Sequence, residues 1–191
     1  MTKNCLLCGV GGQGTVLASK LIAFAAMEKG EQVRTSETIG MSQRGGCVVS
    51  HVRTGDNIQS PMLPKGSADV IIAFEPAEAV RNLSYLKKGG VVIVNKKAVK
   101  PVTASLSGSD YDGREMLDYL TSAVKKLTVV DGDEICDKCG SPKVLNIAML
   151  AAAAKSGELG ITVEELKSAI KKRIPQKFHD MNLKAVEIVT G

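Results

Sequence analysis

Residues 5–14 read Cys5-Leu6-Leu7-Cys8-Gly9-Val10-Gly11-Gly12-Gln13-Gly14, and the rest of the 191-residue sequence is interpreted from this stretch. Its apolar start and the Ala-rich residues 15–26 behind it predict a strand, a tight glycine turn and a helix. The spacing Gly9-x-Gly11-x-x-Gly14 lets a backbone approach a phosphate closely and directs amide N–H groups at an anion. The stretch therefore indicates a phosphate or nucleotide site. The alternative is a turn that only packs a helix onto its strand.

The residues around the glycine turn predict half of a mononucleotide-binding βαβ unit. Residues 3–8 should form a strand, 12–29 a helix and 31–36 a second strand, with Gly30 ending the helix. The polar residues 35–46 then form a connection longer than a strand–helix turn needs. Long loops of this kind in compact domains are often functional.

The next residues should add antiparallel pairing to the sheet. Residues 47–54 have the composition of a strand, and 58–61 should pair back after a turn as a short edge strand. Two continuous apolar runs, 68–74 and 91–95, are typical of buried parallel strands. The sheet should therefore be mixed.

The remaining residues complete an α/β fold whose C-terminal third is helical. Short strands are expected at 101–105 and 127–130, and helices at 76–83, 113–126, 142–155, 163–172 and 175–189. We expect one domain over residues 1–191, a Rossmann-like three-layer sandwich around a mostly parallel, partly mixed sheet.

Composition narrows the classes of protein to consider. Lysine and arginine number 25 against 20 acidic residues, a net charge of +5, and the lysines are dispersed as on solvated surfaces. The sequence has no tryptophan, three phenylalanines and three tyrosines, too few for base stacking, so no nucleic-acid partner is expected. No apolar run approaches the roughly 20 residues of a membrane span. Five cysteines and no signal-peptide pattern predict a cytoplasmic protein without membrane contact.

The cysteines and histidines do not form a recognisable metal site, and no metal ligand is predicted. Cys5 and Cys8 should point to opposite faces of a strand as buried thiols. Cys136 and Cys139 form a C-x-x-C pair on a turn or short helix, where a metal or a redox disulfide stays an alternative. His51 and His179 are interpreted as structural or surface residues, and no acid–base constellation can be identified.

A dinucleotide interpretation of the glycine turn is incomplete. NAD binding would place an acidic residue at the end of the second strand to hold the ribose. That strand ends in Arg34-Thr35-Ser36, and Glu37 falls just past it. A stand-alone NAD(P) oxidoreductase, an adenylating enzyme and a structural subunit with an empty turn stay as alternatives.

Two motifs together resemble a known family. Residues 9–14, Gly-Val-Gly-Gly-Gln-Gly, and residues 37–46, Glu-Thr-Ile-Gly-Met-Ser-Gln-Arg-Gly-Gly, are similar to the gamma-type domain of 2-oxoacid:ferredoxin oxidoreductases. Within this family, the sequence of residues 36–53 is most similar to the beta subunits of the indolepyruvate ferredoxin oxidoreductases. Weaker matches, among them Ser60-Pro61, Glu75-Pro76 and Asn146, extend the resemblance over nearly the whole chain.

The resemblance implies a subunit that is not active alone. A larger alpha subunit would carry thiamine diphosphate and iron–sulfur clusters, and the complex would convert an aryl 2-oxoacid and coenzyme A to an acyl-CoA while ferredoxin receives the electrons. This chain would complete the site, with a phosphate of coenzyme A or of the thiamine cofactor at the glycine turn. The residues assigned to the cofactors are Gly9, Gly11, Gly12, Gln13, Gly14, Ser42, Gln43 and Gly45. Arg44 is the catalytic candidate, because a guanidinium can grip a carboxylate or phosphate with two hydrogen bonds.

Overall fold

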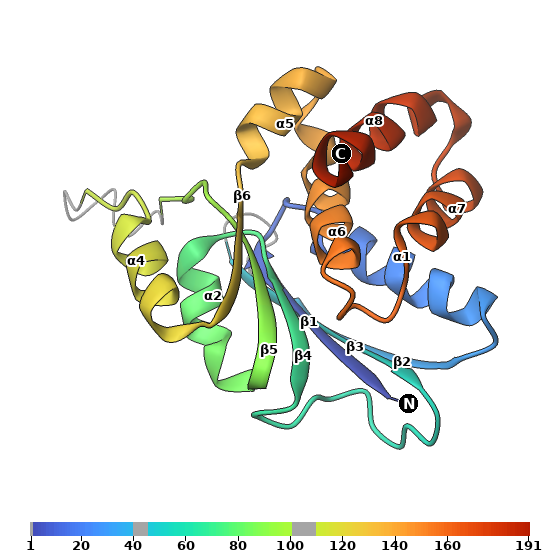
Figure 1. Ribbon diagram of the computed structural model, residues 1–191, viewed down its shortest axis with the longest axis horizontal. Coiled ribbons are helices and arrows are strands. Elements are labelled where there is room, and N and C mark those ends of the chain that lie inside the picture. Colours follow the sequence, from blue (N-terminus) through green and yellow to red (C-terminus); the bar gives the residue numbers. More distant parts are fainter. Residues whose placement is uncertain (1, 40–45, 101–109) are drawn as a thin grey trace.

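The computed structural model describes residues 2–39, 46–100 and 110–191, which form a six-stranded sheet with helices on both faces (Figure 1). The strands are β1 (Lys3–Val10), β2 (Gln32–Ile39), β3 (Cys47–Gly55), β4 (Ala68–Ala73), β5 (Leu86–Asn95) and β6 (Lys126–Val130). The α-helices are α1 (Thr15–Glu28), α2 (Pro76–Asn82), α4 (Arg114–Ala123), α5 (Gly132–Cys139), α6 (Leu145–Lys155), α7 (Val163–Arg173) and α8 (His179–Thr190). Short 3-10 turns precede β5, α6 and α8 at Leu83–Tyr85, Pro142–Val144 and Gln176–Phe178.

The sheet has the order β2-β3-β1-β4-β5-β6 and is mixed, as the sequence predicts. β1, β4, β5 and β6 are parallel neighbours, whereas β3 is antiparallel to both β1 and β2. The prediction of half a mononucleotide-binding βαβ unit is wrong in one respect. β2 runs in the direction of β1 but is separated from it by β3, because β3 folds back on β2 as a hairpin and pairs along the whole of β1 from Lys3↔Thr54 to Val10↔Cys47.

Two further expectations about this hairpin need correction. Residues 58–61 form no strand, since the antiparallel partner of β3 is β2 and not the segment that follows. The predicted polar loop 35–46 is shorter than expected, because Thr35–Ile39 continue β2 and pair with Val52 to Val48 of β3. Polar residues are tolerated there because β2 lies at the edge of the sheet. The strand predicted at 101–105 lies outside the described residues.

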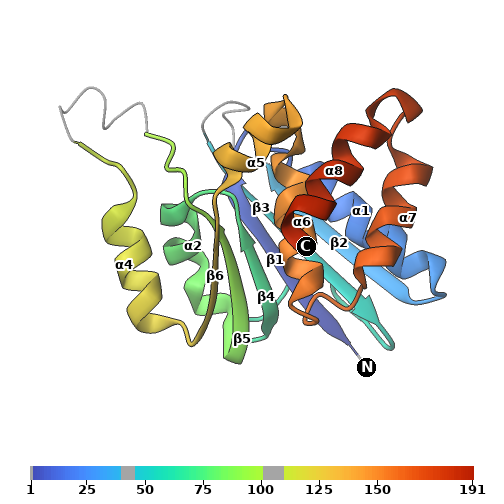
Figure 2. The ribbon, with the colours of Figure 1, turned by 45° about the horizontal axis from the view of Figure 1, so that its top comes forward.

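The sheet divides the hydrophobic core into two layers. On one face, Cys5, Leu7 and Ile72 pack with α1, α6, α7 and α8. On the other face, Leu6 and Ile71 pack with α2 and α4, and Figure 2 shows the two helical layers on opposite sides of the sheet. Cys5 and Cys8 fall into different layers, as their spacing predicts, and burial raises the pKa of both thiols.

The C-terminal helical third is organised around α6. Residues Asn146 to Ala154 of this helix are all buried, which explains its uniform Ala-rich sequence. The predicted capping box of α7 is present, with Thr162 accepting from the Glu165 N–H and Glu165 accepting from the Thr162 N–H. The three-layer α/β architecture with a helical C-terminal third is confirmed. No helix in the described ranges is long and apolar enough to cross a membrane.

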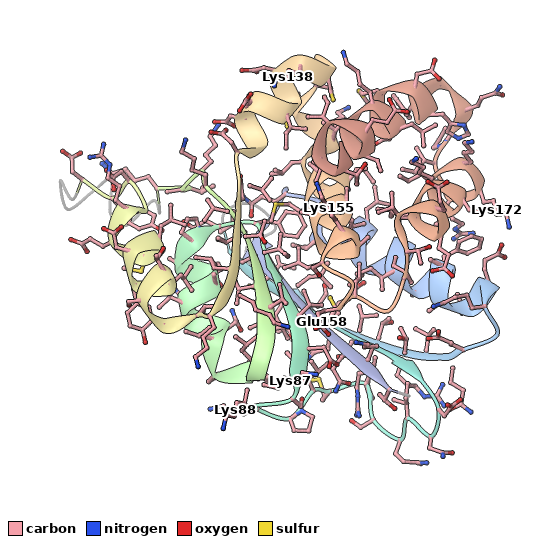
Figure 3. All side chains as sticks on the ribbon, viewed as in Figure 1. Lys87, Lys88, Lys138, Lys155, Glu158 and Lys172 are labelled. Atoms are coloured by element: carbon pink, nitrogen blue, oxygen red, sulfur yellow. The ribbon has the colours of Figure 1, made fainter. Side chains whose placement is uncertain are left out.

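Surface lysines are dispersed, and many are neutralised locally. Lys87 pairs with Asp69, and Lys138 pairs with Glu134 at 2.7 Å. Lys172 of α7 pairs with Glu28 of α1, which ties two helices far apart in sequence. Figure 3 shows the labelled lysines spread over the molecule from the start of β5 to α7. The predicted solvated faces are therefore confirmed for these side chains.

Candidate functional site

The glycine turn lies where the chain connections on the two faces of the sheet diverge. β1 and β4 are adjacent and parallel, but β1 leads into α1 on one face and β4 into α2 on the other (Figure 2). In α/β proteins, ligands bind outside the carboxyl ends of two such strands. Gly9 to Gly14 follow β1 and Phe74 and Glu75 follow β4 at this position, which we call the crevice.

Three glycines of the turn are needed for different physical reasons. A side-chain carbon at Gly9 would lie 2.6 Å from the Gln13 Oε1 and 2.9 Å from the Phe74 Cβ, so Gly9 permits close approach of the strand ends. Gly14 begins α1 with a φ of 83°, and a side-chain carbon there would lie 3.0 Å from the Asn146 amide. Gly12 has a φ of +101°, and a side-chain carbon there would have no atom within 4 Å. The turn is therefore closely packed at Gly9 and Gly14 and open at Gly12.

The side chain of Gln13 joins the two sides of the crevice. Its Oε1 accepts from the Val10 N–H at 2.8 Å, and its Nε2 donates to the Phe74 carbonyl at 3.0 Å. Asn95 at the end of β5 donates to the same carbonyl at 3.2 Å and accepts from the Gly132 N–H at 3.2 Å. A chain of two carboxamides therefore connects β1, β4, β5 and the start of α5. Both polar ends of the Gln13 side chain are used, and its backbone N–H donates to the Val10 carbonyl at 3.3 Å, so Gln13 shapes the turn.

The start of α1 suits an anion. No side chain of the described residues caps this helix, and its first turn contains no acidic residue. The first N–H groups of a helix lack partners within the helix and carry a partial positive charge. The arrangement of open glycine turn and uncapped 14-residue helix has the features of a phosphate cradle.

A buried acidic cluster borders the β4 side of the crevice. Glu75 is 2% exposed, and its Oε2 accepts from the Glu78 N–H to cap α2 at 3.1 Å. Its Oε1 accepts from the Tyr111 hydroxyl at 2.6 Å, and burial together with this contact raises the pKa of Tyr111. Beside it, a pocket of about 570 Å³ is lined by Lys96, Lys97, Lys100, Tyr111, Asp131 and Asp133. Sequence reasoning used Glu75-Pro76 as a helix start and as a match to the family, and it missed Tyr111, which belongs to no motif.

A second buried carboxylate lies on the α2 face near the end of β1. Glu78 is 4% exposed, and its Oε2 has no partner among the described residues. Its Oε1 lies 3.4 Å from the Nε of Arg81, whose Nη1 approaches the Cys47 sulfur at 3.6 Å. Burial raises the pKa of Glu78, while Arg81 and Cys47 lower it.

The second predicted motif is only partly placed by the structure. Ser42, Gln43, Arg44 and Gly45 lie outside the described residues. Gly46, directly behind them, accepts a hydrogen bond from the Gly11 N–H at 2.9 Å. One end of the motif is therefore joined to the glycine turn.

His51 is a structural residue, as predicted. It is 2% exposed, its Nδ1 accepts from the Leu63 N–H at 3.3 Å, and its ring packs edge-on against Tyr85. Burial lowers its pKa. His179 contacts the Ile174 carbonyl at 2.7 Å through its Nε2.

Cys136 and Cys139 are free thiols on α5, and burial raises the pKa of Cys136. Within the described ranges, no group of three or more His, Cys, Asp or Glu side chains is placed to hold a metal.

The geometry does not favour the dinucleotide alternative. The ribose-binding acid of that fold stands at the end of the strand next to β1. Here that neighbour is the antiparallel β3, and Glu37 on β2 instead accepts from the Ser19 hydroxyl at 3.0 Å.

Comparison with known proteins identifies full-length relatives. A family model described as pyruvate ferredoxin/flavodoxin oxidoreductase matches residues 4–190. The chain is 35% identical over 187 residues to the indolepyruvate oxidoreductase subunit IorB of Pyrococcus horikoshii, covering 97% of this chain and 93% of the relative. It is 37% identical over 189 residues to the subunit of the same name from Archaeoglobus fulgidus, covering 98% and 94%.

Solved structures agree with the fold. The gamma subunit of a keto/oxoacid ferredoxin oxidoreductase from Geobacter sulfurreducens matches with a TM-score of 0.70 at 24% identity, covering 98% of this chain and 96% of that one. At this identity the match is evidence for the three-layer arrangement alone.

We predict that Gln13→Ala lowers the free energy of unfolding by about 1–3 kcal/mol, because the Val10 N–H loses its acceptor at a partly buried position. The matched control is Gln59→Ala, since Gln59 is exposed, and this change should stay within about 0.5 kcal/mol of the wild type. Urea unfolding measures both. Equal unfolding free energies of the two variants would show that the Gln13 side chain does not stabilise the turn.

A second prediction concerns the pH dependence of stability. Because burial lowers the folded-state pKa of His51, the unfolded state takes up a proton first as the pH falls below about 6.5. His51 therefore contributes stability above that pH which is lost toward its folded pKa. His51→Asn keeps an acceptor near the Leu63 N–H without the titration, so its unfolding free energy should fall less between pH 7.5 and 5.5. An unchanged pH slope would show that His51 does not contribute to it.

Proposed function

The chain belongs to the pyruvate ferredoxin/flavodoxin oxidoreductase family, and we propose that it is the smaller subunit of an indolepyruvate:ferredoxin oxidoreductase. The complex would oxidatively decarboxylate an aryl 2-oxoacid, transfer the acyl group to coenzyme A and pass the electrons to ferredoxin. The observation that carries the proposal is the match over nearly the whole chain to subunits named for indolepyruvate.

The residues of this chain support a role in which it completes an active site that lies partly on the larger subunit. The crevice between β1 and β4 offers an open glycine turn and an uncapped helix, both suited to a phosphate. Thiamine diphosphate on the larger subunit would supply the decarboxylation, and iron–sulfur clusters there would carry the electrons. Cys5, Cys136 and Cys139 border one core layer and Cys8 the other, and no three His, Cys, Asp or Glu side chains of the described residues are placed together to hold a metal.

Within this proposal the residues have separate tasks. Gly11, Gly12 and Gly14 would let the backbone contact a phosphate of coenzyme A or of the thiamine cofactor. Gln13 would hold the turn in shape through its two hydrogen bonds. Ser42, Gln43, Arg44 and Gly45 would form the wall toward the partner subunit, with Arg44 gripping a carboxylate or phosphate.

The function can be tested by assembling the complex. The chain, co-expressed with the larger subunit from the same organism, should reduce ferredoxin when given indolepyruvate and coenzyme A, and each subunit alone should be inactive. Aryl 2-oxoacids should give a higher kcat/KM than pyruvate. A complex that prefers pyruvate would overturn the substrate assignment, and a chain active without its partner would overturn the subunit role.

Arg44→Ala in the assembled complex should lower kcat/KM for the 2-oxoacid or for coenzyme A by about 10-fold to 100-fold, because a charged hydrogen bond contributes about 1.5–3 kcal/mol. The subunits should still elute together. Arg114→Ala is the matched control, since Arg114 is an exposed arginine on α4 paired with Asp112 at 2.8 Å. Unchanged kinetics for both substrates would remove Arg44 from the site.

A further inference from the structure

One exposed thiol lies beside the crevice. All five cysteines are free, and they differ in accessibility: Cys47 is exposed, Cys139 is half-buried, and the other three are buried, namely Cys5, Cys8 and Cys136. Burial raises the pKa of these three thiols, which keeps them protonated and unreactive. Cys47 is therefore the thiol to which a reagent in solution has the freest access.

Two charged side chains of α2 meet at Cys47. The Arg81 Nη1 donates to the Cys47 sulfur at 3.6 Å, and the Arg81 Nε lies 3.4 Å from the Glu78 Oε1. The Cys47 thiol also lies close enough to Glu78 to lower the pKa of that carboxyl. The sulfur, the guanidinium and the carboxyl form one contiguous group, and we call these three residues the Cys47 cluster.

Glu78 is the member of the Cys47 cluster whose hydrogen bonding is incomplete. It is 4% exposed, and its Oε2 has no hydrogen-bond partner among the described residues. A buried carboxylate that lacks partners is costly as an anion, and burial accordingly raises the pKa of Glu78. A proton on Glu78 would remove that cost. It would also free Arg81, which pairs with no other carboxylate of the described residues, to stabilise a thiolate at Cys47.

The Cys47 cluster adjoins the glycine turn. Cys47 is the cross-strand partner of Val10, the last residue of β1, and the neighbouring Gly46 accepts a hydrogen bond from the Gly11 N–H at 2.9 Å. α2 lies on the face of the sheet opposite α1 (Figure 2), so the cluster and the start of α1 lie on different sides of the turn. A group attached to the Cys47 sulfur would therefore stand beside the crevice.

We infer that Cys47 is a modification site that forms a mixed disulfide with a small thiol compound, and that Arg81 and Glu78 activate it. Glu78 accepts the thiol proton, and the thiolate, held by Arg81, attacks one sulfur of a low-molecular-weight disulfide. A new S–S bond forms as the old one breaks. Cys47 is oxidised, and the leaving half of the reagent is reduced to a thiol that carries the proton from Glu78. The competing explanation is an ordinary ion pair between Glu78 and Arg81, with Cys47 only lying next to it.

The test uses the full chain alone, treated with glutathione disulfide and followed by intact-mass spectrometry and peptide mapping. One glutathione should attach, at Cys47, and Cys47→Ser should abolish the attachment while Cys139→Ser leaves it unchanged. Arg81→Gln should slow the reaction at neutral pH by about threefold to tenfold and shift its pH profile upward, because fewer thiols ionise and the higher nucleophilicity of the thiolate only partly compensates. Arg114→Gln is the matched control, since it removes an exposed arginine of α4, and it should change neither.

Attachment at Cys139, or a pH profile that Arg81→Gln does not move, would overturn the inference. The consequence for the crevice rests on the proposed function and is measured separately. The modified chain, freed of reagent and assembled with the larger subunit, should lose most of its turnover, and dithiothreitol should restore it. Full turnover by the modified chain would show that Cys47 does not border the site. An unmodified complex without activity would instead overturn the proposed function, while the reaction of the chain alone would stand.

Discussion

The candidate site depends on two hydrogen bonds of the Gln13 side chain, which accepts from the Val10 N–H and donates to the Phe74 carbonyl. β1 and β4 lie side by side, but the helices that follow them pack on opposite faces, so the carboxyl ends of the two strands are left without a common cover. One carboxamide spans that gap and fixes the turn between Gly9 and Gly14. Gly9 makes the bridge possible, because any side chain there would meet the Gln13 amide and the Phe74 side chain.

The insertion of β3 between β1 and β2 determines which ligands the crevice can suit. In a dinucleotide-binding fold the strand beside β1 carries the acid that holds a ribose. Here the antiparallel β3 takes that place, and β2 with Glu37 moves to the edge of the sheet. The same insertion brings Gly46 against Gly11 and therefore attaches the second sequence motif to the first. A phosphate can still be received at the turn, since that requires only the backbone and the start of α1.

Sequence reasoning succeeded where the signal is local. The apolar runs of β4 and β5, the capping box at Thr162 and the opposite faces of Cys5 and Cys8 all follow from periods of a few residues. It failed where the structure depends on contacts between residues far apart in the sequence. The extension of β2 to Ile39 depends on its register with β3, and the contact of Tyr111 with Glu75 joins residues 36 positions apart. Such contacts leave no pattern in a single sequence.

Under the proposed function, the glycine turn and the start of α1 serve a site that this chain shares with another subunit. The start of α1 has no side-chain cap among the described residues, and a side-chain carbon at Gly12 would have no atom within 4 Å. Both features lie just past the carboxyl end of β1. A capping side chain at the start of α1 would stabilise the isolated chain by about 1 kcal/mol. The lack of one is explained if the first N–H groups of this helix receive an anionic group in the assembled complex.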